Sequence, residues 1–372
     1  MIQLPNSNEL DTLAFTSMFT HLTNSYKLFW FKAIFDRVIS GEANIQISDL
    51  TSKIIEYAFP LIHTYKLNFG GADQLKVTLK TIPDNYSGRT DAKSICNAIP
   101  NIQEVKFRNQ IKNYVPYRLL SPFYRDIISG IKDDNKKNQL ILQASNSDHF
   151  SFYKIDLSVD SIIVNPLWIN YILSNQSLID AWFKYHLITF LQSRNPSTPN
   201  IPFKVDSSMI SRSLNLQQKY WNFAIKANPS LNFDIYIKEE FSNDSISKYG
   251  MLSLDHVIPF DFVMHNELWN LTPIHRNINS AKSNHLPSLN FIYEVANQNY
   301  EFFKTIQVFY PLNPRERHPL EDYEYLNPLL NHKNFEIHKD DFTQIMMGQL
   351  TSLHTIAKNQ GFSIWQPFSK ID

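Results

Sequence analysis

Apolar residues recur at helical spacing along most of this chain, which favours a fold built mainly from packed helices. In the stretch SYKLFWFKAIFDRVISG the large apolar residues share one helix face, Ser25 is a candidate N-cap and Gly41 follows the end. Further helices are predicted for ISDLTSKIIEYAF, which stops before Pro60, and for ADQLKVTLKTI and NIQEVKFRNQIKNYV. With 43% hydrophobic and 14% aromatic residues, the chain can fill a substantial core.

The hydrophobic period changes between Gln139 and Asn165, where short alternating runs predict a small antiparallel sheet at 139–165. Helices return in PLWINYILSN and SLIDAWFKYHLITFLQ, and a Pro- and Ser-rich linker, RNPSTPNIP, follows at 194–202. Beyond it we expect one long helix in SSMISRSLNLQQKYWNFAIKAN, a strand in NFDIYIKEEF and two helices after residue 289.

These patterns predict an α+β fold that is mostly α-helical. We expect a mainly helical N-terminal region at 1–200, a separate domain at 201–295 and a helical C-terminal region at 296–372. The N-terminus lacks a signal-peptide pattern and the apolar runs are shorter than a membrane span, so a soluble, cytoplasmic protein without membrane association is expected.

Composition excludes several kinds of site. The chain has eight glycines and neither GxGxxG nor GxxxxGK[ST], so nucleotide binding by those loops has no support. Its single cysteine, Cys96, excludes an internal disulfide and a Cys-rich zinc site. Lys+Arg and Asp+Glu both number 35, so any role with nucleic acid must rest on local patches or bound metal. Outside residues 251–288 the strongest basic stretch runs from Glu104 to Lys137. Its tyrosines and phenylalanines could face nucleic acid, but we expect a mixed amphipathic surface.

The segment 251–288, MLSLDHVIPFDFVMHNELWNLTPIHRNINSAKSNHLPS, gathers polar residues suited to metal chemistry. LSLDHVIP predicts a strand that ends at Pro259, and a bend there lets Asp255 and His256 serve one site. The Asp255 carboxylate is a hard ligand suited to Mg²⁺ or Mn²⁺, and a neutral His256 imidazole can accept a proton from water.

Two more polar residues lie on the helix-compatible stretch NSAKSNHL. Asn279 offers a further hard oxygen ligand, and Lys282, three residues later on the same face, could approach a phosphate beside the metal. A structural alternative stays open for Asn279, which could instead satisfy free N–H groups at the start of the helix.

The order LDHVIP, ELWNLTP, NINSAKSNHLPS resembles the HNH endonuclease motif, or ββα-metal finger, of RNA-guided CRISPR nucleases and of bacterial restriction and defence nucleases. The resemblance implies that His256 is the general base, that Asp255 is the first metal ligand and that Asn270 braces the histidine loop. It also implies that Asn279 binds the metal at the start of the helix, with Lys282 following it.

The resemblance covers roughly residues 251–288, about a tenth of the chain. It implies an embedded ββα-metal (HNH) finger that uses Mg²⁺ or Mn²⁺ to hydrolyse phosphodiester bonds of DNA, double-stranded DNA first of all. Such a protein would act as the effector of a bacterial restriction or anti-phage system, and a sensor or ATPase protein is a candidate partner. A non-catalytic HNH-fold module that binds nucleic acid or an assembly partner stays open, as does an RNA-directed nuclease.

The segment departs from many HNH proteins, which bind a structural zinc through two CxxC pairs. His275 and Ile278 occupy the positions of the second pair, so no structural zinc is expected and packing against helices must hold the finger. Ser253 replaces a further acidic residue, which leaves the metal fewer protein ligands. His265, His275 and His285 fit no zinc spacing. We expect all three to be loop or surface residues, and His275 or His285 could touch the substrate.

Overall fold

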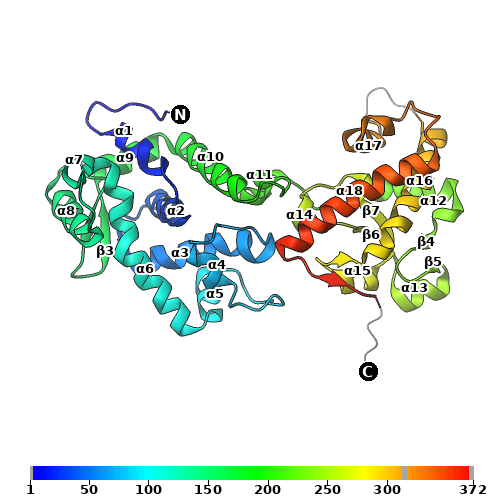
Figure 1. Ribbon diagram of the computed structural model, residues 1–372, viewed down its shortest axis with the longest axis horizontal. Coiled ribbons are helices and arrows are strands. Elements are labelled where there is room, and N and C mark those ends of the chain that lie inside the picture. Colours follow the sequence, from blue (N-terminus) through cyan, green and yellow to red (C-terminus); the bar gives the residue numbers. More distant parts are fainter. Residues whose placement is uncertain (1–2, 312–316, 368–372) are drawn as a thin grey trace. The chain divides into compact units, whose positions relative to one another are not determined.

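The computed structural model describes residues 3–311 and 317–367 (Figure 1). The chain packs as two compact units, unit 1 at Met1–Pro196 and unit 2 at Ser197–Asp372. Both units are mainly helical with small sheets, so the predicted α+β, mostly helical class is confirmed. Within the described residues, no helix combines the length and the apolarity that crossing a membrane requires.

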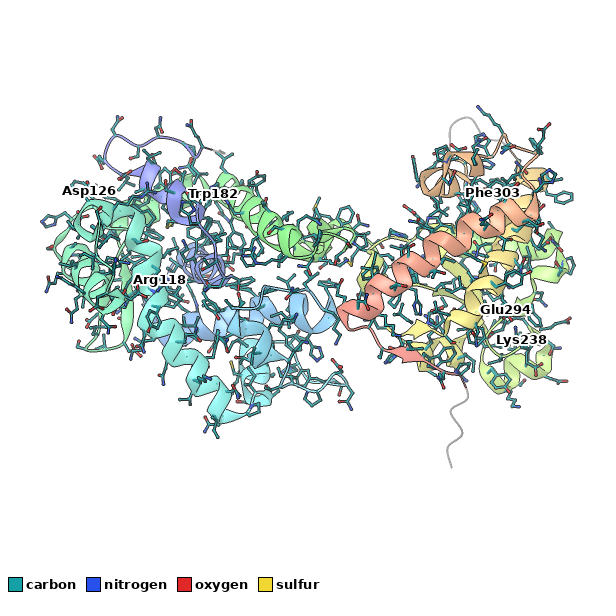
Figure 2. All side chains as sticks on the ribbon, in the orientation of Figure 1. Arg118, Asp126, Trp182, Lys238, Glu294 and Phe303 are labelled. Carbon is teal, nitrogen blue, oxygen red and sulfur yellow. The ribbon has the colours of Figure 1, made fainter. Side chains whose placement is uncertain are left out.

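Unit 1 is built around α2, a helix whose aromatic residues are buried on nearly all sides. Phe15 stacks on Trp168 with ring centroids 4.8 Å apart, and Phe19 stacks at 4.6 Å on Trp182, which Figure 2 labels. Such rings supply much of the apolar area that stabilises the unit. The helices of unit 1 are α1 (Thr12–Thr16), α2 (Tyr26–Ile39), α3 (Ile47–Phe59), α4 (Gln74–Leu79), α5 (Ala92–Ala98), α6 (Asn101–Leu120), α7 (Arg125–Ile128), α8 (Asp134–Ser147), α9 (Pro166–Ser174) and α10 (Gln176–Arg194).

The predicted small sheet exists, but only its second half lies where the sequence suggested. Strands β2 (Tyr153–Asp156) and β3 (Ser161–Val164) pair antiparallel, and β1 (Asn44–Gln46) adds to the other edge of β3. Residues 139–147, expected in the sheet, belong to helix α8. The Asp133 side chain accepts hydrogen bonds from two free N–H groups at the start of α8, which favours a helix through the ambiguous apolar run.

Unit 2 contains the predicted site segment together with the helices that follow it. Its helices are α11 (Ile201–Val205), α12 (Asn215–Ala227), α13 (Asn243–Tyr249), α14 (Phe260–Val263), α15 (Arg276–Lys282), α16 (Ile292–Phe309), α17 (Glu321–Leu326) and α18 (Lys339–Gln360). Its strands are β4 (Phe233–Asp234), β5 (Glu239–Glu240), β6 (Leu252–His256), β7 (Leu271–His275), β8 (Leu286–Pro287) and β9 (Ile364–Trp365). The long helix predicted for 207–228 is confirmed only over α12, and its first part, 207–214, is wrong because α12 begins at Asn215. The preceding residues are Ser-rich and mostly exposed, and serine competes with helical backbone bonding.

One core joins the strands of unit 2 to its helices. Leu254 of β6 and Leu271 of β7 are buried in the same cluster as Trp221 of α12, Phe303 of α16 and Phe342 of α18. Two further strand pairs complete unit 2, of which β8 and β9 pair parallel. The stretch predicted as one strand, NFDIYIKEEF, forms the short antiparallel hairpin of β4 and β5. Figure 2 marks Lys238 and Glu294, which form an ion pair between the hairpin turn and α16.

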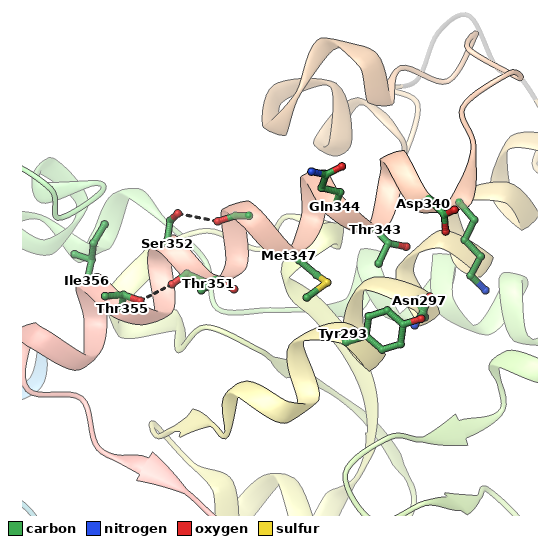
Figure 3. A pocket seen from close by; sticks show the side chains of 12 residues that line it. Tyr293, Asn297, Asp340, Thr343, Gln344, Met347, Thr351, Ser352, Thr355 and Ile356 are labelled. Carbon is green, nitrogen blue, oxygen red and sulfur yellow. Dashed lines mark hydrogen bonds between the residues drawn. The ribbon is translucent and has the colours of Figure 1, made fainter.

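A hollow of about 860 Å³ runs along α16 and α18, and its lining comes from these two helices. Figure 3 shows Tyr293 of α16 and Met347 of α18 at this hollow. The Ser352 and Thr355 hydroxyls donate to carbonyl oxygens one turn earlier in α18, at 2.7 and 2.8 Å. The hollow is therefore lined by side chains outside the predicted site segment.

Candidate functional site

The site segment folds as two antiparallel strands followed directly by a helix, so the predicted ββα order is confirmed. In the β6–β7 pair, Asp255 lies opposite Thr272 and His256 lies opposite Leu271. Helix α15 begins at Arg276, immediately after β7, and packs on both strands. In this arrangement the end of β6 lies next to the last turn of α15.

Asn270 holds the loop that follows the histidine. It is fully buried, its Nδ2 donates to the Ile258 carbonyl, and its Oδ1 accepts from the Ile258 N–H, both at 2.9 Å. The Asn270 carbonyl also accepts from the Val257 N–H at 2.9 Å. These bonds fix the backbone immediately after His256, which is the placement that a bracing residue requires.

The His256 ring is partly buried at the end of β6. Its Nε2 lies 3.0 Å from Oδ1 of Asn266, and the Asn266 Nδ2 donates to the carbonyls of Ser211 and Ser213, at 2.8 and 3.2 Å. Because that amide presents its oxygen to the ring, Nε2 carries the proton and Nδ1 carries the lone pair. Burial lowers the pKa of His256 to about 4, and the hydrogen bond with Asn266 partly opposes this. The imidazole is thus neutral near pH 7.

Asp255 is held in a buried ion pair. Its side chain is 3% exposed, and Oδ1 lies 2.9 Å from the Nζ of Lys282, which is 0% exposed. Oδ2 accepts from the Tyr236 hydroxyl at 3.0 Å. Burial raises the pKa of Asp255, and the Lys282 ammonium opposes the rise. Lys282 also donates to the His256 carbonyl at 2.9 Å. Lys282 thus contacts two oxygens of β6, the Asp255 carboxylate and the His256 carbonyl.

Asn279 joins α15 to β6. Its Nδ2 donates to the Leu254 carbonyl and to the Ser253 hydroxyl, both at 3.1 Å. Both bonds use the amide nitrogen, so Oδ1 is the atom of this side chain that could act as a metal ligand. The interpretation of Asn279 as a mere cap at the helix start has less support, because the helix begins three residues earlier.

The donor set fits a weakly held Mg²⁺ or Mn²⁺ ion better than a closed metal site. It offers one carboxylate, from Asp255, and one amide oxygen, from Asn279. Over residues 3–311 and 317–367, no three His, Cys, Asp or Glu side chains gather closely enough to hold a metal. Mg²⁺ is commonly bound through one or two protein oxygens, with waters and substrate phosphates completing its shell.

The expectation that His275 is a loop or surface residue is wrong. It ends β7 and is fully buried, with Nδ1 2.8 Å from Oδ2 of Asp234 and Nε2 3.1 Å from the Ser245 hydroxyl. The Phe241 ring stacks on it at 4.3 Å. This polar network, from the β4–β5 hairpin and α13, surrounds a position where many HNH proteins place a zinc-binding cysteine. Packing and hydrogen bonds thus hold that corner of the finger.

The other two histidines lie in loops beside the site. His265 tilts against Trp269 at 5.1 Å, and burial lowers its pKa to about 3. His285 is half-buried, with Nδ1 2.7 Å from the Lys282 carbonyl.

Sequence reasoning missed three residues that contact the site's side chains. Tyr236 and Asp234 belong to the stretch NFDIYIKEEF, whose sequence pattern predicted one ordinary strand. Asn266 lies inside the quoted segment, but an Asn-rich chain gives one asparagine little weight. The order of polar residues along the chain does not identify Asn266 as a partner of His256, because that contact depends on how the loop folds back on the histidine.

Residues 234–288 match the family model described as HNH endonuclease. The match begins at Asp234, so it includes the β4–β5 hairpin as well as the ββα segment. No curated protein matches the chain significantly, and no solved structure does so either.

Proposed function

Because this chain is an HNH-family protein, with its HNH domain at residues 234–288, we propose that it is a metal-dependent endonuclease that hydrolyses phosphodiester bonds of DNA. The placement of His256 carries the proposal. This neutral imidazole stands at the end of β6, next to the Asp255 carboxylate, on a loop that Asn270 fixes. A nuclease needs such a base beside a hard ligand for a metal ion.

In this proposal His256 accepts a proton from the attacking water through Nδ1, while Asn266 holds Nε2–H and so sets the ring's orientation. Asp255 and Asn279 would hold Mg²⁺ or Mn²⁺, which supplies charge stabilisation at the phosphate and the departing 3′ oxygen. Lys282 keeps the buried Asp255 carboxylate ionised and oriented toward α15.

The proposal extends to the kind of DNA that is cut and to the biological system in which the protein acts. Double-stranded DNA is the proposed substrate, and an effector role in a restriction or anti-phage system in the cytoplasm is the proposed setting. The net charge of zero argues against binding by bulk electrostatics, so a sensor or ATPase partner that delivers the substrate fits the composition.

One observation favours a second candidate, a non-catalytic HNH module that binds nucleic acid or a partner subunit. Both oxygens of Asp255 already accept hydrogen bonds, from Lys282 and from Tyr236. A metal ion must therefore share this carboxylate with a buried ammonium, which weakens its binding.

The deciding experiment is a nuclease panel of plasmid, linear, single-stranded and modified DNA and of RNA, each with Mg²⁺ or Mn²⁺. We expect His256→Ala to lose about 10²- to 10⁴-fold in rate, the usual contribution of a general base. His338→Ala, an exposed histidine of the same unit, is the matched control and should keep full activity.

Equal cutting by His256→Ala would overturn the assignment of the base. A wild-type protein that binds these nucleic acids but cuts none of them would favour the non-catalytic module. Cleavage of RNA alone would move the substrate assignment from DNA to RNA.

A further inference from the structure

Unit 1 contains a hollow of about 740 Å³ that is separate from the HNH domain. It is bounded by the start of α2, by the middle of α6, by α8 and by the turn at Gly130. Its volume lies in the range of sites that take small molecules and cofactors. The side chains that line it indicate which ligand chemistry it suits.

Lys27 is the central charge of this hollow. Its ammonium donates to the backbone carbonyls of Met18 and His21, at 2.9 and 3.2 Å, and both of these acceptors are neutral. Burial, together with the nearby positive charge of Arg118, lowers the pKa of Lys27 to about 8. Two cations that repel each other in one concave surface favour the entry of an anion.

Two more cationic side chains reach the same hollow from α6 and α8. Arg118, labelled in Figure 2, and Lys137 both line it, and they share the one lining carboxylate, Asp134. The Arg118 Nη2 lies 2.8 Å from Oδ2 of Asp134, whereas the Lys137 Nζ lies 3.7 Å from Oδ1. With Lys27, three positive groups therefore face a single negative one. Since the whole chain is neutral, this excess is local.

The remaining lining combines a ring, apolar surface and side-chain amides. Tyr114, which is 38% exposed, lines the hollow together with Ile128 and Ile131. Gln110 and Asn24 add donors and acceptors. The charged, aromatic and amide groups of the lining suit a ligand that has two parts. An anionic group would lie beside Lys27 and Arg118, and a flat polar ring joined to it would lie against Tyr114.

We propose that this hollow binds a small phosphorylated ligand of the nucleoside monophosphate class, with the phosphate at Lys27 and Arg118 and the base near Tyr114. The inference does not depend on the proposed nuclease activity, because none of its residues belongs to the HNH domain. It also gives part of the basic stretch from Glu104 to Lys137 a role other than an amphipathic surface.

Isothermal titration calorimetry of the full chain with AMP, GMP, CMP and UMP tests the proposal, with the four nucleosides and a 5′-phosphorylated twelve-base DNA oligonucleotide as comparisons. We expect saturable binding of at least one nucleotide at one site, at least tenfold tighter than its nucleoside. Absence of nucleotide binding at millimolar concentration would overturn the proposal. Tighter binding of the oligonucleotide than of every mononucleotide would also overturn it, in favour of a nucleic-acid surface.

Variants assign the binding to this hollow. Arg118→Gln and Lys137→Gln change partly exposed side chains, so the fold should survive. Arg118→Gln should weaken nucleotide binding about tenfold through the loss of a charge-assisted contact, and Lys137→Gln should weaken it by a smaller factor because it removes one positive charge from the lining. Lys106→Gln, an exposed residue of the same α6 helix, is the matched control and should bind as wild type does. Unchanged affinity in both pocket variants would place any nucleotide site elsewhere and refute the inference.

Discussion

Replacing Lys282 with methionine removes the cation that faces Asp255 inside unit 2. Because the Lys282 side chain is 0% exposed and that of Asp255 3%, solvent cannot take over the role of the lost partner. Breaking a buried pair from one side typically destabilises a protein by about 3–5 kcal/mol. An upper bound comes from protonating Asp255 instead, since moving a proton onto a carboxyl of ordinary pKa at pH 7 costs about 4 kcal/mol. We therefore expect a loss of about 3–4 kcal/mol at pH 7.

The size of this loss should depend on pH and on the partner residue. As the pH falls from 7 toward about 4, protonating the stranded carboxyl costs less, so the deficit of Lys282→Met relative to wild type should shrink. The double variant Asp255→Asn/Lys282→Met carries no stranded charge and keeps an amide oxygen that can accept from Tyr236. It should therefore be more stable than the sum of the single changes predicts, by about 2 kcal/mol or more.

Hydrogen exchange measured by mass spectrometry on the full chain can localise the effect to unit 2. Peptides covering β6 and β7 should exchange about 10²- to 10³-fold faster in Lys282→Met, since each 1.4 kcal/mol is tenfold. Lys219→Met, an exposed lysine on α12, is the matched control and should change stability by less than about 0.5 kcal/mol. Strictly additive single changes, or a loss below about 1 kcal/mol in Lys282→Met, would refute a coupled buried pair.

Four further outcomes are expected. Stability should fall as pH drops from 6.5 toward 4, because the unfolded chain binds protons on His256 and His265 before the folded chain does; a flat profile in thermal unfolding would contradict this. Asn270→Ala leaves two buried backbone groups without partners, so urea unfolding should show a loss of about 2–4 kcal/mol, with nuclease activity falling too. Asn266→Ala should slow cleavage about tenfold or more while shifting the melting temperature little, and restored activity in Asn266→Gln would mark a positioning role. His275→Ala should lower stability by about 2–4 kcal/mol in calorimetry without a change in metal affinity, and a change in metal affinity alone would contradict its structural role.

The sequence predicted those parts of the site that depend on local order along the chain. A strand ending near Pro259 and a helix before Pro287 follow from proline positions and apolar spacing, whereas the second strand, after Asn270, was implied by the resemblance to the ββα motif. The buried bonds of Asn270 agree with the bracing role that the resemblance implied. Each of these features involves residues within about twenty positions of one another.

Contacts that depend on how distant segments pack could not be predicted in this way. His275 looked like one of three unassigned histidines, and its burial depends on Asp234, 41 residues earlier, and on Ser245. The errors at 139–147 and 207–214 have a local cause. In the first an aspartate cap favours a helix over a strand, and in the second exposed serines prevent a helix that the pattern allowed.

Lys282 bears on how a finger with few metal ligands can bury its carboxylate. A closed metal site has several carboxylates that share one cation, whereas over residues 3–311 and 317–367 no three His, Cys, Asp or Glu side chains gather in this way, and Asp255 is buried beside Lys282. Without a permanent cation, burial of that carboxylate would be costly, and the ammonium of Lys282 supplies the charge from within the same finger. The folded state is then complete before any metal arrives. If Asp255 holds a metal ion, as we propose, the ion would have a positive neighbour whose repulsion the negative charge of a bound phosphate would offset, so we expect metal and nucleic acid to bind this site together rather than one after the other.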